Sequence, residues 1–79
     1  MRATVKSIQQ RFGDVLRRRR EAVGLSQEAL AAVAALHRNY VGRLERGQMI
    51  PSLAVVEKIS AALGVTMSKL IAEVESLVD

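Results

Sequence analysis

Apolar residues recur at helical spacing along almost the whole 79-residue chain, and no stretch alternates apolar and polar residues with period two. Ile8, Phe12, Leu16 and Val23, for example, lie on one stripe of a helix. The pattern therefore predicts an all-α fold, a compact bundle of five helices. The predicted helices cover about residues 7–23, 27–34, 38–46, 52–63 and 66–78.

Local start and stop signals separate these segments. A glycine follows the first, third and fourth predicted helices, at the position where a left-handed residue commonly ends a helix: Gly24, Gly47 and Gly64. Residues able to cap a helix start precede the last four: Ser26, His37, Ser52 and Thr66. Because the connections are short, the chain is predicted to form one domain, residues 1–79.

Length and composition exclude several classes of protein. A chain of 79 residues is one small domain, and without cysteine it has neither disulfides nor thiolate metal sites. Its core is marginal for its size, which favours self-association. The sequence shows no membrane span and no secretory signal, so we expect a cytoplasmic protein, bacterial or phage-encoded. It lacks an assembled catalytic group, so we expect no enzyme activity, cofactor or metal.

The positive charge is concentrated in the first part of the chain. Formal net charge is +6 over residues 1–50 and −2 over residues 51–79. A one-sided basic surface is typical of proteins that bind a polyanion such as nucleic acid. The run Arg17–Arg20 is also compatible with a solvated helix face, so charge alone leaves both interpretations open.

The segments 27–34 and 38–46 predict a helix-turn-helix, because two short helices joined by a tight turn have matching apolar faces. The inward residues are Leu30, Ala31 and Ala34 from one helix, and Val41 and Leu44 from the other. The residues predicted to point away from the core are Arg38, Asn39, Gly42, Arg43 and Arg46. Arginine pairs with guanine and asparagine with adenine in the major groove of DNA, so we predict that Arg38, Asn39 and Arg43 read bases.

One ion pair is predicted to join the first helix to this recognition helix. Arg20 lies on the inward stripe of Phe12 and Leu16, and Glu45 leans inward from the helix at 38–46. A partly buried arginine needs a carboxylate partner, which makes an Arg20–Glu45 pair a structural prediction. The alternative is that Arg20 extends to solvent.

Four segments together resemble the Xre/Cro-type helix-turn-helix family of lambdoid phage repressors, restriction–modification controller proteins and antitoxins. They are residues 24–31 (GLSQEALA), 40–47 (YVGRLERG), 51–53 (PSL) and 63–65 (LGV). The resemblance covers about residues 10–72, and controller proteins are the group most similar in size. It implies a DNA-binding regulator in which Gln27 contacts a phosphate, and it matches Arg38, Asn39 and Arg43 to base-reading positions.

The remaining site predictions concern the DNA backbone and the turn. Besides Gln27, the predicted phosphate contacts are Ser26, His37, Tyr40 and Arg46. The chain departs from the family pattern at two positions. Ala35 stands where a glycine is usual, and the left-handed conformation there costs an alanine about 1 kcal/mol. Gly42 stands where many members have serine, which either permits close approach to DNA or has no consequence.

The last prediction is a homodimer on a pseudo-palindromic double-stranded DNA operator. The helices at 52–63 and 66–78 carry more apolar surface than the bundle can cover, and such patches usually mark interfaces. We predict an interface through the last helix and the end of the preceding one, with Ile71, Val74, Leu77 and Val78 as contacts. RNA polymerase is a further candidate partner. An antitoxin, a phage-type repressor or a protein-interaction module without DNA binding remain the alternatives.

Overall fold

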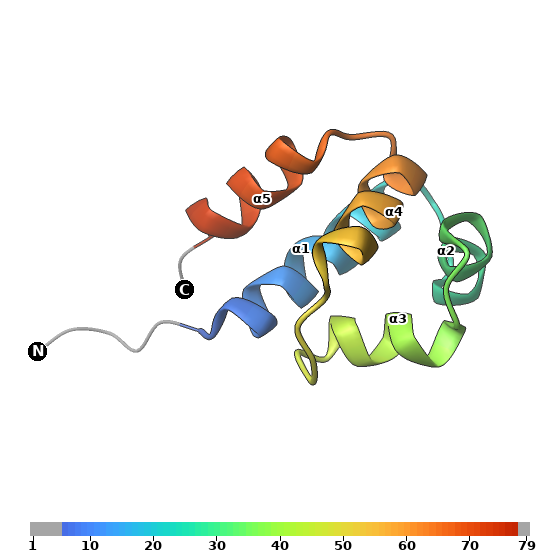
Figure 1. Cartoon of the computed structure of the whole chain (residues 1–79), viewed down its shortest axis with the longest axis horizontal. Helices are drawn as coiled ribbons and strands as arrows, with labels where there is room; N and C mark the ends of the chain where they lie inside the picture. Colours follow the sequence, from blue (N-terminus) through green and yellow to red (C-terminus); the bar gives the residue numbers. More distant parts are fainter. Residues whose placement is uncertain (1–5, 78–79) are drawn as a thin grey trace, which may run out of the picture.

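The computed structural model describes residues 6–77 and is all-α, as the sequence predicts (Figure 1). Its helices are α1 (Ile8–Ala22), α2 (Gln27–Ala34), α3 (Arg38–Glu45), α4 (Leu53–Leu63) and α5 (Met67–Ser76). Each lies within one or two residues of its predicted range at either end. The predicted last residue of α5, Val78, lies outside the described residues.

Side-chain caps fix every helix start. Ser26, Ser52 and Thr66 each accept a hydrogen bond from the backbone N–H three residues on, and His37 caps α3 through its ring. These four caps confirm the predicted starts. The sequence interpretation missed a fifth cap, on α1. Ser7 and Gln10 form a reciprocal capping box there, in which each side chain bonds the other's backbone N–H.

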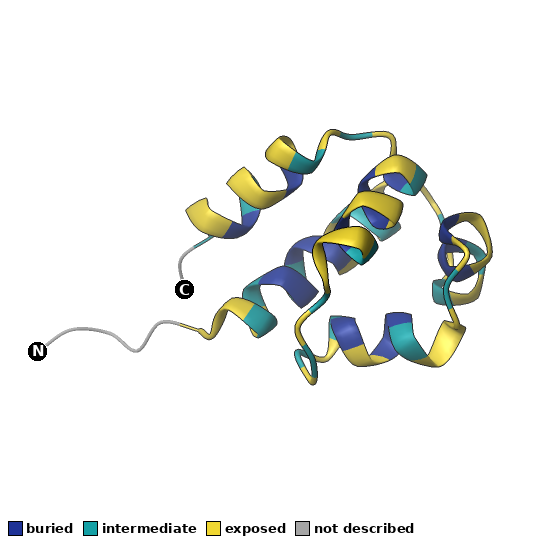
Figure 2. Cartoon of the chain, viewed as in Figure 1, coloured by how far each residue is buried: buried dark blue, intermediate teal, exposed yellow. Residues whose placement is uncertain are grey.

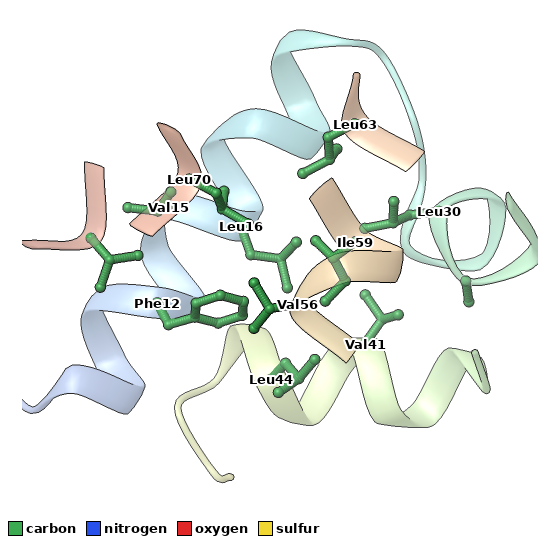
Figure 3. Close-up of a cluster of buried hydrophobic side chains, with 12 residues drawn as sticks. Phe12, Val15, Leu16, Leu30, Val41, Leu44, Val56, Ile59, Leu63 and Leu70 are labelled. Carbon is green, nitrogen blue, oxygen red and sulfur yellow. The ribbon is translucent and has the colours of Figure 1, made fainter. Parts of the chain in front are cut away.

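The core lies between α1, α3, α4 and α5, with α2 closing one end (Figures 1 and 2). Leu16, Leu44 and Ile59 are fully buried and come from three different helices (Figure 3). The prediction that Ile8 and Val23 share the buried stripe of α1 is wrong, because they are 56% and 50% exposed. The neighbouring helices cover only the middle of α1, so its two ends reach solvent.

A close crossing of α1 and α3 sets the position of α3. Gly13 lies at the crossing, and a Cβ atom built on it would lie 2.6 Å from the carbonyl oxygens of Leu44 and Glu45. Real Cβ atoms do not approach backbone oxygen so closely, so only glycine permits this contact. The end of α3 is therefore held directly against the backbone of α1.

Candidate nucleic-acid interface

Helix α3 lies along one edge of the molecule, next to α2, and packs inward on α1 and α2 (Figure 1). Val41 and Leu44 are fully buried and anchor it to the core. The turn between α2 and α3 is closed by Ala35 in the left-handed conformation, with φ 57° and ψ 45°. Ala35 therefore adopts the left-handed conformation that glycine adopts more readily.

The three predicted base-reading residues are all exposed on α3: Arg38, Asn39 and Arg43. Arg38 donates a hydrogen bond from Nη1 to Oε2 of Glu28 at 3.0 Å. Both side chains of this pair are well exposed, so the interaction is weak and easily exchanged for another acceptor. Arg43 has no ion pair among residues 6–77. The exposed face of α3 thus presents guanidinium and amide donors on a rigid helix.

Two of the predicted phosphate contacts are also helix caps. The Ser26 hydroxyl oxygen accepts from the Ala29 N–H at 3.0 Å, which leaves its own O–H free to donate. His37 Nδ1 accepts from the Asn39 N–H at 3.2 Å, so the proton of the neutral ring sits on Nε2. Both residues are exposed, and each keeps a donor that can bind a phosphate oxygen.

The predicted Arg20–Glu45 pair is present and is bidentate. Arg20 Nε lies 2.5 Å from Glu45 Oε2, and Arg20 Nη2 lies 3.0 Å from Glu45 Oε1. Hydrogen bonding to Glu45 raises the pKa of Arg20 above its ordinary value. The Gln27 amide donates to the same carboxylate at 2.9 Å. Gln27, predicted as a phosphate contact, is therefore also part of the network that joins α1, α2 and α3.

Gly42, predicted to point away from the core, is buried. Its face does turn outward, but the side chains of Gln27 and Arg46 cover it. Arg46 is exposed, as a phosphate contact requires. Tyr40 is half-buried and packs against the core cluster, so only part of its side chain is accessible.

The four predicted dimer contacts differ in how accessible they are. Val74 is only 2% exposed and belongs to the core, because it lies four residues after Leu70 on the stripe of α5 that packs on α1. Leu77 is half-buried against the same cluster, whereas Ile71 is 42% exposed. At the end of α4, Leu63 is buried as well. Val78 lies outside the described residues.

The surplus apolar surface lies in a groove of about 460 Å³ between the starts of α1 and α4 and the second half of α5, where Ile71 and the buried Val74 are among its lining residues. Its exposed apolar residues are Ile8, Ile50, Leu53 and Ile71, which are 56%, 64%, 76% and 42% exposed. We call this groove, with its four exposed apolar residues, the apolar groove. The sequence interpretation missed Ile8 and Ile50, although the apolar face predicted for residues 52–63, too wide for an ordinary helix, was a signal for Leu53.

Other kinds of site find no support. Among residues 6–77, no group of three or more His, Asp or Glu side chains could hold a metal ion. None of the helices described has the length and apolar content that a membrane crossing requires.

Comparison with known proteins identifies the fold's family. A helix-turn-helix family model matches residues 16–70. The control protein C.MunI of Mycoplasma sp. is 43% identical over 72 residues, covering 90% of this chain and 97% of that protein. The control protein C.BamHI of Bacillus amyloliquefaciens is 47% identical over 55 residues, 68% of each chain.

A solved structure agrees with these relatives. The restriction–modification controller protein C.AhdI of Aeromonas hydrophila is 45% identical, with a TM-score of 0.77 over 78% of this chain and 94% of that one. Family membership also makes the chain a regulator and not an enzyme. The chain belongs to the helix-turn-helix family of DNA-binding transcriptional regulators, in the group that includes the restriction–modification controller proteins.

Proposed function

We propose that this protein is a sequence-specific controller of a restriction–modification operon that binds its operator through α3. The observation that carries the proposal is the exposed face of α3, where Arg38, Asn39 and Arg43 stand on a helix fixed to α1 and α2. An eight-residue helix is about 12 Å long, and the major groove of B-DNA is about 12 Å wide. The names of its relatives supply the biological setting.

Phosphate contacts on both sides of α3 would fix its register in the groove. Ser26 lies at the start of α2, while His37 and Arg46 lie at the two ends of α3. All three are exposed and carry a donor group. Contacts of this kind position a protein on DNA without reading sequence, which leaves specificity to the exposed face of α3.

Selection of binding sites from a pool of random duplex DNA tests the proposal. We expect a motif with two related half-sites whose centres lie about one helical turn, ~10 bp, apart or at a related spacing. Affinity for the selected duplex should fall steeply as salt rises, because several cationic side chains displace counterions. Recovery of no motif, or an affinity that is insensitive to salt, would contradict the proposal.

We further propose that the protein is a homodimer, and we move its interface to the apolar groove. Four of the six large hydrophobic residues that are exposed within residues 6–77 line this one groove. The groove includes Ile50, in the segment that leaves the end of α3, and it does not include the exposed face of α3. A twofold axis there would therefore leave both recognition helices free to face one duplex.

The dimer is tested by Leu53→Asp in the first turn of α4. Leu53 is 76% exposed, so the change leaves the core intact, and an acidic residue is favourable at a helix N-terminus. Sedimentation should show a monomer, with binding to the selected duplex weakened and helicity retained. Ala54→Asp is the matched control, because Ala54 is exposed in the same turn but does not line the groove. A Leu53→Asp protein that sediments like the parent would contradict the interface.

RNA polymerase is a further proposed partner of the dimer. If the dimer activates transcription in the cytoplasm, it must contact RNA polymerase beside the promoter. Transcription from a template that carries the selected site tests this, with purified polymerase and increasing amounts of the protein. A rise in transcript supports the polymerase contact, whereas repression at every concentration contradicts it. An antitoxin or phage-type repressor would use the same α3 face.

A further inference from the structure

Position 42 differs from the rest of the exposed face of α3 because it carries no side chain and is nevertheless buried. A Cβ atom built on Gly42 would lie 3.1 Å from Nη1 of Arg46 and 3.5 Å from Oε1 of Gln27. It would also lie 3.9 Å from Cζ of Arg46. The guanidinium of Arg46 therefore occupies the space that a side chain at position 42 would take.

The course of Arg46 follows from helix geometry. Residues four apart lie on the same face of a helix, and helical side chains point back toward the N-terminus. Arg46, the residue that caps the end of α3, therefore extends over residue 42. With glycine at that position, the guanidinium of Arg46 borders the space over residue 42, which the amide oxygen of Gln27 borders as well.

The surrounding charges leave Arg46 as the group that would bind an anion. A shallow depression of about 210 Å³ is lined by Arg17, Arg20, Glu21, Gln27, Glu45 and Arg46. Arg17 pairs with Glu21, and Arg20 pairs with Glu45. Within the described residues, Arg46 is the lining cation without an ion pair. Because the other arginines are neutralised locally, the anion attraction of the depression depends on Arg46.

We propose that Gly42 is a positioning residue: by leaving room for the guanidinium of Arg46 beside the amide oxygen of Gln27, it lets that guanidinium hold a DNA phosphate. The inference rests on the proposed DNA-binding function. Because the contact is to phosphate, its loss should weaken binding to all sequences by a similar factor.

The test is a double-mutant cycle between Gly42→Leu and Arg46→Ala, with a 30-bp mixed-sequence duplex as the probe. A leucine side chain fills the space over residue 42 and displaces a flexible side-chain end, not backbone. Each single variant should lose about 10-fold in affinity at low salt. Each should also reduce the slope of log K against log salt by about 0.9, the value for one lost phosphate contact. The double variant should bind like either single variant.

Three controls separate this effect from others. Gly42→Ala should melt no lower than the parent and up to about 4–8 °C higher, since alanine favours helix over glycine, while its affinity falls between parent and Gly42→Leu. Arg46→Lys should retain the salt slope of the parent. Ala61→Leu adds the same side chain on the exposed face of α4 and should bind like the parent.

Two results would overturn the inference. One is a salt slope for Gly42→Leu equal to that of the parent. The other is an equal loss when Gly42→Leu is added to Arg46→Ala, which would mean that the leucine blocks DNA directly. Failure of the proposed function itself has a different signature, because the parent protein would then bind neither the mixed duplex nor the selected one.

Discussion

At the scale of single residues, Gly13 is the position where local preference and tertiary contact conflict most strongly. Alanine at a helix interior normally stabilises by about 1 kcal/mol relative to glycine. Here the added Cβ would lie 2.6 Å from two backbone carbonyl oxygens of α3, so α1 and α3 must separate. We predict that Gly13→Ala lowers the free energy of unfolding by about 1–3 kcal/mol, as overpacking does. Urea titration measures it, and a variant as stable as the parent would contradict the crossing.

At position 35 the native residue, Ala35, is itself strained, whereas at position 13 the strain would come from the substitution. Ala35 is exposed and left-handed at φ 57°, a conformation that costs a residue with a Cβ about 1–2 kcal/mol. Replacing the alanine by glycine removes this strain, but it also raises the conformational entropy of the unfolded chain, which offsets part of the gain in stability. We predict that Ala35→Gly raises the free energy of unfolding by about 0.5–1 kcal/mol. A thermal melt that is unchanged or lower would show that the turn is not strained.

At the scale of elements, the Arg20–Glu45 pair locks α1 to α3. The two side chains are only 12% and 4% exposed, and removal of one leaves a buried charge without its partner. We predict that Arg20→Ala or Glu45→Ala each destabilises the fold by about 3–5 kcal/mol. The double variant should cost clearly less than the sum, because the second change removes the stranded charge. Urea melts without DNA decide this, and additive losses would mean that the two residues act independently.

A second pair, Arg19–Glu73, ties α1 to α5 and makes stability depend on pH. Arg19 Nε donates to Glu73 Oε1 at 2.9 Å, and this hydrogen bonding lowers the pKa of Glu73 below its ordinary 4.5. A carboxylate with a lowered pKa stabilises the fold above its unfolded pKa, and the stabilisation is lost as pH falls through the folded pKa. Glu73→Gln should therefore melt below the parent at pH 6–8, by a small amount because the pair is partly exposed.

The difference in melting temperature between parent and Glu73→Gln should shrink once the pH drops below about 4.5 and vanish at still lower pH. Arg17→Gln is a suitable control, since it breaks the more exposed pair with Glu21. A difference that grows on acidification would contradict the assigned direction of the pKa.

The elements also show which features the sequence could predict. Caps such as Ser26 and His37 act locally, so their chemistry is visible in the residues themselves. The Arg20–Glu45 pair was predictable because helical spacing placed both residues on inward faces. The role of Gly13 could not be predicted, because it depends on how closely α3, which is distant in sequence, approaches α1.

The prediction of Val74 as a dimer contact is wrong for a related reason. Helical periodicity shows that α5 has an apolar stripe, but it does not show which residues of that stripe are buried in the protein's own core. Leu70 and Val74 are buried where α5 packs against α1, whereas Ile71 remains exposed. The same applies to Gly42, whose cover comes from Gln27 on another helix. The residues that remain exposed depend on how the helices pack together. The spacing of apolar residues within one helix does not show that packing.

For the whole molecule, the two surfaces to which we assign functions are separated in space. Exposed arginines lie on α3, while the apolar groove is formed by α1, α4, α5 and the segment before α4. The formal net charge is also uneven, +6 over residues 1–50 and −2 over residues 51–79, although the groove takes Ile8 and Ile50 from the basic part of the chain. A dimer built on the groove therefore would not cover the surface that meets DNA.

The central claim is that the exposed face of α3 reads bases, and site selection with Arg43→Ala tests it most directly. Arg43 is exposed and outside the core, so the variant should melt like the parent. We predict a loss of about 1–3 kcal/mol in operator binding and relaxed base preference at one position in each half-site. Arg18→Ala removes the same charge from an exposed site on α1 and should return the parental motif. An unchanged motif for Arg43→Ala would contradict the claim.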